Sequence, residues 1–360
     1  MNRFKNLLLT TFSLAISLII IEIFLSFFYP QARNGSWRIQ NEDGVFLNKN
    51  NGKSIHEFLG KSEKISVEYN FGKYHNRIIL DDKYKKNNNK VLVLGDSFIF
   101  GWLLEDEDMF ITKLQNYFSK YYFINAAAGG FGDVDMYLYI DRYCSEIKPK
   151  IILFFTDIDR ALGKNSLAIN SKNELIINKN EINKIKRFLN NKNFFYFLIE
   201  NFHSMQLIKK IYLQVSNNVY VNYVKDNDPN LNKVKKIFTN NKIEKDKINE
   251  ATENFQKEKK LIEKLYNKIL HSSNMCNAKI IFIDKGWSDR KYDSKINRYI
   301  MENFLNIFDE KKFNFISIYD EMENMRKSKN KYLLEEGHPN AKANDLFFKY
   351  LKVKLIKYFN

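Results

Sequence analysis

Two short clusters of polar residues in this chain have side chains that can do chemistry. The first is Gly95-Asp96-Ser97, which follows the apolar run KVLVL at 90–94. A serine at such a place can cap a helix, or it can act as a nucleophile where a base, an orienting acid and an oxyanion site lie nearby. The second cluster is EEGHPN at 335–340, in which His338 follows two glutamates. Serine, histidine and a carboxylate are the residue types that perform acyl transfer.

Two further loops carry residues suited to the same site. NAAAGGFGD at 125–133 holds three glycines, which let backbone N–H groups approach a ligand closely. Their spacing matches neither a dinucleotide-binding motif nor a P-loop, and a plain turn is the alternative. The other loop is FTDIDR at 155–160. The four remaining histidines are expected to be solvated: His56, His75, His203 and His271.

The elements that must position these loops follow from short apolar runs of strand length, at 90–94, 121–125, 150–155, 278–284 and 313–320. Amphipathic segments of helix length separate them, and the chain closes with one such segment at 341–359. This alternation predicts a parallel α/β sheet. Because the carboxyl ends of parallel strands meet at one edge, the polar loops are expected to converge there.

Together these blocks resemble the SGNH hydrolase superfamily, often called GDSL-type esterases. The resemblance rests on Gly95 to Phe98, on Asn125 to Gly130 and on the cluster at 335–340, and it extends over most of Val91 to Phe359 in order and spacing. It implies a flavodoxin-like three-layer α/β/α sandwich with a five-stranded parallel sheet. It implies neither a metal nor an organic cofactor.

The resemblance also implies a role for each site residue. Ser97 would be the nucleophile and His338 the general base, with Glu335 as the acid three residues before the base. The backbone N–H groups of Ser97 and Gly130 would bind the oxyanion.

Two positions depart from the family pattern. The acid is usually aspartate, whereas Glu335 has an extra methylene but can still orient an imidazole, and Glu336 is not expected to replace it. The third block usually presents an asparagine whose amide donates to the oxyanion, and FFTDID has none at that place. Aligning Asp157-Ile158 with the family's continuation places Thr156 there, so the Thr156 hydroxyl is the expected third donor.

The segment from Leu7 to Pro30 is apolar apart from Glu22, and at ~1.5 Å per residue it is long enough to cross a ~30 Å hydrocarbon layer. It predicts an uncleaved single-pass signal anchor over residues 1–30. A cleaved secretory signal is the alternative, but YPQARNG after the segment lacks a clear pair of small residues for cleavage. Arg3 and Lys5 place the N-terminus in the cytoplasm and the rest of the chain outside it, at the periplasmic face of the inner membrane.

The rest of the chain divides by composition. Residues 31–89 are polar, and we expect them to form a lead-in that packs against the main domain without a core of its own. Residues 90–360 form the hydrolase-like domain. Between 155 and 278 lies more chain than a crossover helix requires, so a helical insertion is expected from about 159 to 245, as a cap over the site or a contact with the membrane surface.

The formal net charge of +16 could suggest a nucleic-acid partner. The lysines are interleaved with asparagine and isoleucine, with no arginine-rich stripe, so we predict no binding to nucleic acid. Cys144 and Cys276 are too few for a metal site or a disulfide framework, but outside the cytoplasm they can pair.

The sequence therefore predicts a membrane-anchored serine esterase or deacetylase that hydrolyses O-acyl esters. Saccharides of the cell envelope are the expected substrates, an inference from location alone. One alternative is an O-acyltransferase that uses the same residues. Another is a degenerate protein that binds a glycan or a partner without turnover, because the third-block asparagine is missing. The acyl group, the acceptor and the oligomeric state are not set by the sequence.

Overall fold

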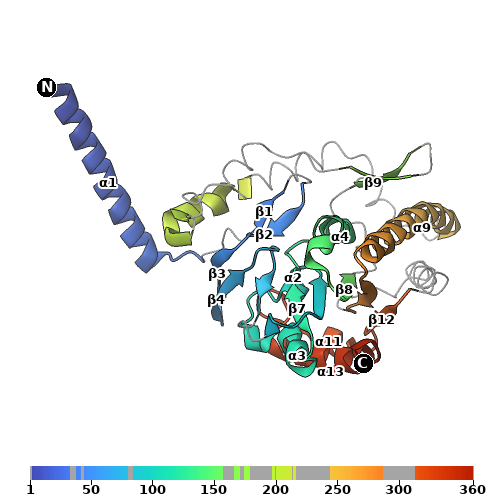
Figure 1. Cartoon of the computed structure of the whole chain (residues 1–360). Helices are drawn as coiled ribbons and strands as arrows, with labels where there is room; N and C mark the ends of the chain where they lie inside the picture. The colour runs from blue at the N-terminus through green and yellow to red at the C-terminus, as the bar shows by residue number, and fades with distance from the viewer. Residues whose placement is uncertain are drawn as a thin grey trace.

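The computed structural model describes residues 2–32, 38–41, 44–79, 84–156, 166–170, 174–178, 197–198, 200–212, 214–215, 244–286 and 313–359. Within these ranges the chain forms an α/β body and one helix, α1 (Asn2–Phe28), that projects away from it (Figure 1). The body is built around one eight-stranded sheet, and this sheet positions the loops that carry the polar clusters.

Five parallel strands form the centre of the sheet because each is an almost unbroken apolar run. In chain order they are β6 (Lys90–Leu94), β7 (Tyr122–Asn125), β8 (Ile151–Thr156), β11 (Lys279–Asp284) and β12 (Phe315–Ser317). Their order across the sheet is β12-β11-β8-β6-β7, and every neighbouring pair is parallel. This is the flavodoxin-like order. The predicted five-stranded parallel sheet is confirmed.

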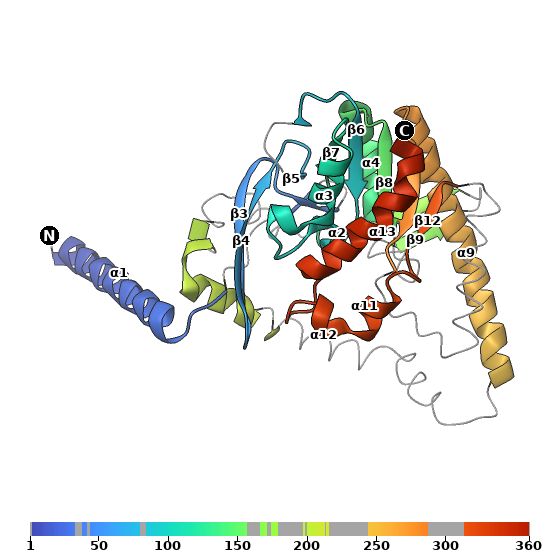
Figure 2. The same cartoon turned by 90° about the horizontal axis from the view of Figure 1, so that it is seen from below.

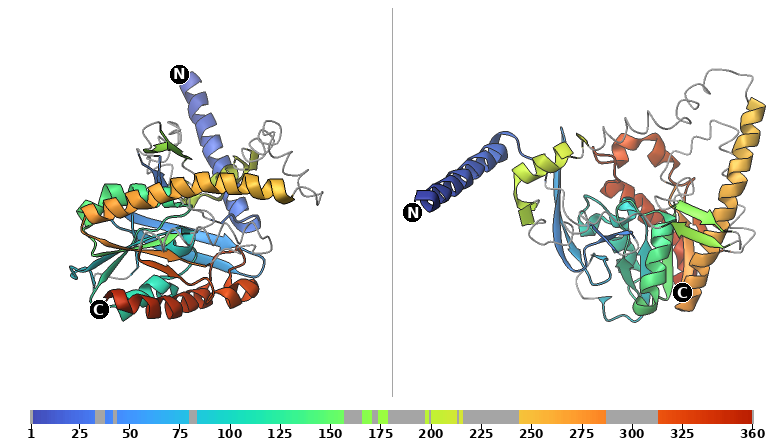
Figure 3. Two further views of the ribbon diagram at one scale, coloured as in Figure 1. Left: turned by 90° about the vertical axis from the view of Figure 1, so that its right-hand side faces the viewer. Right: turned by 90° about the horizontal axis from the view of Figure 1, so that it is seen from above.

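Helices cover both faces of the sheet and complete a three-layer sandwich (Figure 3). One face carries α4 (Asp133–Ile147) and α9 (Glu244–Met275), and the other carries α3 (Phe110–Tyr117) and α13 (Ala341–Phe359). Successive strand residues point to opposite faces. In β8, Phe154 therefore packs under α4 and α9, whereas Phe155 packs under α3 and α13.

The lead-in segment contributes more than packing, because three of its strands extend the sheet beyond β7. They are antiparallel: β3 (Gly52–Leu59), β4 (Lys64–Phe71) and β5 (Arg77–Ile78). A further antiparallel pair, β1 (Arg38–Gln40) with β2 (Phe46–Asn48), forms a small separate sheet. The alternating pattern of KISVEYNF accounts for β4, since period-two alternation is typical of a strand with one buried face. Lead-in and main domain therefore share one sheet.

Arg77 joins the lead-in to the loop after Ser97. Its side chain is fully buried, and its guanidinium donates to the carbonyls of Gly101 at 2.7 Å and Leu104 at 2.6 Å. It also forms an ion pair with Asp106 at 2.8 Å. A planar guanidinium suits this task because its donors lie in a fixed fork. The contacts hold β5 against the segment that follows the candidate nucleophile.

The region between β8 and β11 is described only in part. It contains an antiparallel pair, β9 (Ser166–Ile169) with β10 (Leu175–Asn178), and helical residues at 197–198, 200–201, 203–212 and 214–215. The β9–β10 pair contacts α9, so the predicted insertion is not helical throughout. Asn170, Glu174 and Phe202 are described as well, and so are Glu244 and Lys245 at the start of α9. The other residues of the predicted insertion at 159–245 lie outside the described ranges.

Cys144 near the end of α4 and Cys276 just after α9 form a disulfide, with their Cα atoms 5.9 Å apart. The pairing that the sequence left open is present. It joins the two helices that cover one face of the sheet.

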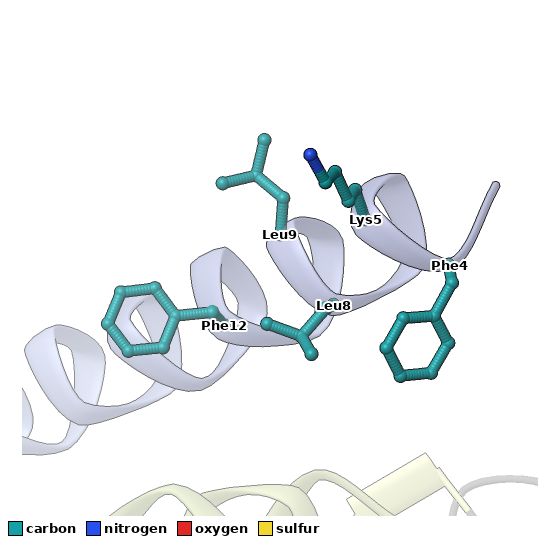
Figure 4. Close-up of a pocket in the computed structure, with 5 residues that line it drawn as sticks. All are labelled: Phe4, Lys5, Leu8, Leu9 and Phe12. Carbon is teal, nitrogen blue, oxygen red and sulfur yellow. The ribbon is translucent and has the colours of Figure 1, made fainter. Parts of the chain in front are cut away.

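The N-terminal helix is largely apolar over Phe4–Phe28, and this stretch of 25 residues is long enough to cross a membrane. Its side chains are exposed to an unusual degree, 70% for Phe4 and 66% for Leu9. Figure 4 shows Phe4, Leu8 and Phe12 projecting from the helix together with Leu9 and Lys5, around a shallow hollow along α1. An exposed apolar surface of this extent marks a contact with a membrane or with another protein.

Candidate active site

Ser97 is the first residue of a short helix, α2 (Ser97–Phe100), directly after β6. The helix is capped by Asp96, whose Oδ1 accepts a hydrogen bond from the N–H of Phe98 at 3.0 Å. Capping is therefore performed by the residue before the serine. The Ser97 hydroxyl, which lies at the carboxyl end of β6, therefore takes no part in capping the helix.

Lys285 holds the turn that carries the serine. It follows β11 at the same edge of the sheet, its side chain is 2% exposed, and its Nζ pairs with the second carboxylate oxygen of Asp96. A buried ammonium is costly without a counter-charge. Lys285 is not among the site residues predicted from the sequence, although its place at the end of an apolar run in IIFIDKGW was a usable signal.

His338 reaches Ser97 across the edge of the sheet. Its Nε2 lies 2.9 Å from the Oγ of Ser97, and its Nδ1 lies 2.6 Å from Oε2 of Glu336. Nδ1–H donates to the carboxylate, so Nε2 is the nitrogen that can accept the serine proton. The three side chains thus form a continuous line of hydrogen bonds. His338 and Glu336 are 17% and 10% exposed, so the pair is largely shielded from water.

The expectation that Glu335 orients the histidine is wrong in this structure, because Glu336 occupies that place. The turn closes between Leu334 and Gly337, with Gly337 N–H on the Leu334 carbonyl at 2.9 Å. Gly337 has a φ of 99°, a left-handed value that favours glycine. This turn folds Glu336 back over His338, whose own N–H donates to Glu336 Oε1 at 3.1 Å.

Glu335 points away from the site, toward the turn between β3 and β4. Its carboxylate accepts the N–H groups of Lys61 at 2.9 Å and Ser62 at 3.1 Å, and also the Ser62 hydroxyl at 3.2 Å. These hydrogen bonds, that of Lys61 first, hold the pKa of the Glu335 carboxyl below its ordinary value. Glu335 therefore fastens the histidine loop to the lead-in hairpin.

Two aromatic rings pack against the edge of His338. The centroid of Trp102 lies 4.5 Å from that of the imidazole and the centroid of Phe98 lies 5.0 Å from it, both nearly perpendicular. Trp102 is held in turn by His56 of β3, because its Nε1–H donates to Nδ1 of His56 at 2.8 Å. This chain of contacts restricts the orientation of the imidazole in addition to its hydrogen bond with Glu336.

His56 is buried, not solvated as expected. Burial lowers its pKa to about 3, and nearby cations such as Lys209 and Arg38 act in the same direction. It therefore stays neutral, with Nδ1 as an acceptor. His75 is buried as well, at 2.7 Å from the Asn48 carbonyl, and the Nδ1 of His203 accepts the N–H of Gln31 at 3.0 Å.

The glycine loop after β7 lies beside the serine turn, because Ala128 N–H donates to the Gly95 carbonyl at 3.0 Å. Arg38 fixes the loop further by donating to the Gly129 carbonyl at 2.6 Å. Gly130 has a φ of 79° and is exposed. Neither the N–H of Gly130 nor that of Ser97 donates to another described residue. Both N–H groups therefore remain candidates for the predicted oxyanion donors.

The expectation that Thr156 donates to the oxyanion is also wrong in this structure. Thr156 is fully buried, and its hydroxyl donates to Oδ2 of Asp133 at 2.8 Å. Tyr266 donates to the same oxygen at 2.6 Å. The physical reason is strand alternation: Thr156 shares its face with Phe154 and points under α4 and α9. Asp157, the neighbouring candidate, lies outside the described residues.

A metal centre has no support in the part of the chain that the structure describes, which contains no group of three or more histidine, cysteine or acidic side chains able to hold an ion. Among the described residues, the candidate site brings together a serine, a histidine, a carboxylate and backbone N–H groups.

No family model matches the chain, and no curated protein matches it. Among solved structures, the chain is similar to a psychrotrophic esterase, EstA, from Pseudoalteromonas sp., with 12% identity and a TM-score of 0.42 over 76% of this chain and 100% of that one. It is also similar to a member of the lipolytic G-D-S-L family from Veillonella parvula (11%, TM-score 0.38, 74% and 98%). A third similar structure is an acetylxylan esterase from Geobacillus stearothermophilus (10%, TM-score 0.38, 75% and 95%).

Proposed function

We propose that this chain is a membrane-anchored serine esterase or deacetylase of the SGNH type that hydrolyses O-acyl esters. One observation carries the proposal: the line of hydrogen bonds from Ser97 Oγ through His338 to Glu336, at 2.9 and 2.6 Å. A serine with a histidine base and an orienting carboxylate is an arrangement that activates a hydroxyl for attack on a carbonyl.

The proposed reaction has two acyl-transfer steps. Ser97 Oγ attacks the ester carbonyl while His338 Nε2 takes its proton, and Glu336 stabilises the imidazolium that forms. The N–H groups of Ser97 and Gly130 donate to the oxyanion of the tetrahedral intermediate. His338 then gives its proton to the leaving alcohol, and the acyl group stays bound to Ser97 as an acyl-serine. A water molecule, deprotonated by His338, then releases the acid and restores the serine.

The proposed substrates are O-acylated saccharides of the cell envelope. This part rests on location: α1 is apolar and long enough to span a bilayer, and the body is then carried outside the cytoplasm. A disulfide between Cys144 and Cys276 fits that compartment, since disulfides persist outside the cytoplasm.

A binding protein without turnover is the second candidate, and the contacts of Thr156 favour it. Because the Thr156 hydroxyl is committed to Asp133, the described residues supply only backbone donors to the oxyanion. Loss of one well-placed donor typically costs ~10²- to 10³-fold in kcat. The third candidate is an acyltransferase. It differs from the esterase and from the binding protein because a hydroxyl of another molecule, in place of water, accepts the acyl group.

The test uses the full chain in detergent micelles, a fluorophosphonate probe and an aryl acetate, with Ser97→Ala as the matched control. The proposed hydrolase should be labelled at Ser97 and release acetate, and Ser97→Ala should do neither. Labelling with release of the aryl alcohol only when a sugar acceptor is supplied, and with the acetyl group found on the sugar in place of free acetate, would indicate a transferase. Absence of both labelling and turnover in the wild type would contradict the enzyme and favour the binding protein.

A further inference from the structure

The helical residues 203–212 and 214–215 expose an apolar face that the esterase proposal does not explain. Ile208, Ile211, Tyr212 and Val215 are 58%, 51%, 70% and 56% exposed. Their spacing of three and four residues places them on one side of the helix. We call these four residues the apolar face. Single exposed apolar residues are ordinary, but a continuous stripe on one helix side indicates a contact.

We propose that the apolar face lies in the outer headgroup layer of the membrane, beside the point where α1 leaves the bilayer. The inference rests on the proposed anchoring by α1 and goes beyond it, because it assigns a second membrane contact to a segment far away in the sequence. The occupant of the face is lipid, and the argument rests on the contacts of this helix with α1.

The start of the helix bonds directly to α1. Glu22 is the only charged residue in the interior of the apolar stretch, and its carboxylate accepts the N–H groups of His203 and of Ser204, the latter at 3.0 Å. Gln31, just after α1, donates its N–H to Nδ1 of His203 at 3.0 Å. A carboxylate inside a membrane span is costly unless polar groups satisfy it. The N–H groups that satisfy Glu22 come from this helix.

The same contact sets the depth of the apolar face. Glu22 lies six residues before the end of α1, which at ~1.5 Å per residue is about 9 Å along the helix axis. Amphipathic helices at a membrane surface bury their apolar side by ~5–10 Å. Ser204, which bonds to Glu22, precedes Ile208 by one helical turn and so lies on the side of the apolar face. The side of the helix that carries the apolar face therefore adjoins the membrane-spanning part of α1.

On the side opposite the apolar face, the first part of the helix packs on the body around Gln206, whereas Lys210 and Gln214 further along are exposed. Gln206 is 5% exposed, and Glu200, just before the helix, forms an ion pair with Lys49 at 3.1 Å. Burial lowers the pKa of Lys209. In Figures 1 and 2 the segment lies between the base of α1 and strand β3. One side therefore faces protein, and the apolar face is turned away from it.

The experiment uses the full chain in vesicles of phosphatidylethanolamine and phosphatidylglycerol. The photoreactive amino acid benzoylphenylalanine replaces Tyr212, Phe12 or Val353, one position per sample, and lipid adducts are measured by mass spectrometry after illumination. Phe12 lies in α1 and reports on the anchor. Val353 is the matched control, because it is apolar and 65% exposed but belongs to α13, away from α1 (Figure 2).

The proposal expects lipid adducts at positions 12 and 212 and none at 353. Glu22→Leu should reduce the lipid adduct at 212 and leave that at 12 unchanged. Adducts at 12 without any at 212 would overturn the membrane contact alone, and so would a protein adduct at 212 in place of lipid. Absence of lipid adducts at position 12 would overturn both the proposed anchor and the proposed membrane contact of the apolar face. Esterase activity in the same vesicles reports on the catalytic proposal separately.

Discussion

Ser97 and His338 act as one unit in the proposed reaction, because the imidazole Nε2 must take the proton of the hydroxyl 2.9 Å away. We expect Ser97→Ala and His338→Ala each to lower kcat on an aryl acetate by on the order of 10³-fold or more, and the double variant to be no worse than either single one. Steady-state kinetics of the three variants measures this. Additive losses would contradict the paired roles.

The choice between the two glutamates gives a second prediction at this scale. Glu336→Gln keeps the size of the side chain but removes the charge that stabilises the imidazolium, so kcat should fall by ~10²- to 10⁴-fold. Glu335→Gln is the matched control, since it makes the same change one residue earlier on a side chain that binds the hairpin turn. A large loss in Glu335→Gln with normal turnover in Glu336→Gln would show that the other glutamate orients the base.

Thr156 is expected to act on stability and not on turnover. Thr156→Val removes a donor from the buried carboxylate of Asp133, which should lower the free energy of unfolding by ~1–3 kcal/mol. The kcat of the folded variant should stay near that of the wild type. Denaturant titration and kinetics separate the two effects. A selective drop in kcat at unchanged stability would return Thr156 to the oxyanion site.

At the scale of elements, the β3–β4 hairpin supports the site from the lead-in segment. It reaches the histidine loop twice, through the contact of its turn with Glu335 and through His56, which holds Trp102 against His338. The sequence predicted only a packing role for the lead-in segment, but its hairpin is connected to His338. The contribution of the hairpin to the stability of the fold can be measured through the titration of His56.

The pH dependence of stability follows from the buried His56. Its pKa is about 3 in the folded chain, against ~6.5 for an exposed histidine. Between these values the unfolded state binds more protons, so stability falls as the pH drops from about 6.5 to about 3. This group should contribute a loss on the order of 3 kcal/mol between about pH 7 and pH 4.

The matched variant for this prediction is His56→Gln, which keeps an acceptor for the Trp102 N–H but does not titrate. Unfolding by urea at several pH values should show a smaller decrease in stability on acidification for the variant. Equal decreases for the two proteins would show that His56 is not the buried neutral histidine described above.

At the scale of the whole molecule, a long apolar helix projects from an α/β body, and the lead-in strand β3 and the helical residues 203–212 lie close to its base (Figure 1). We predict that the mature chain keeps residues 1–30 and exposes its C-terminus outside the cytoplasm. A reporter that is active only outside the cytoplasm, fused after Asn360, should therefore be active. Activity of a cytoplasm-only reporter at the same position would reverse the predicted topology.

Local patterns determined much of this protein. The five apolar runs are continuous because parallel strands are buried on both faces, so the number of these strands and their parallel arrangement follow from the sequence. The convergence of the loops that contain Ser97 and His338 follows from parallel topology. The long N-terminal helix follows from the length of one apolar run. Each of these features depends on neighbours along the chain.

Only the tertiary structure decided which side chains meet. Glu335 and Glu336 are adjacent and chemically alike, and the turn at Gly337 selects the second of them. The Thr156 hydroxyl points to the face of the sheet under α4 and α9, not to the oxyanion site. Its direction depends on the position of Thr156 in the strand alternation of β8, which the sequence did not determine. His56 and Lys285 gained their partners from elements 46 and 189 residues away. Such choices depend on burial and on contacts between distant segments, which periodicity and spacing do not record.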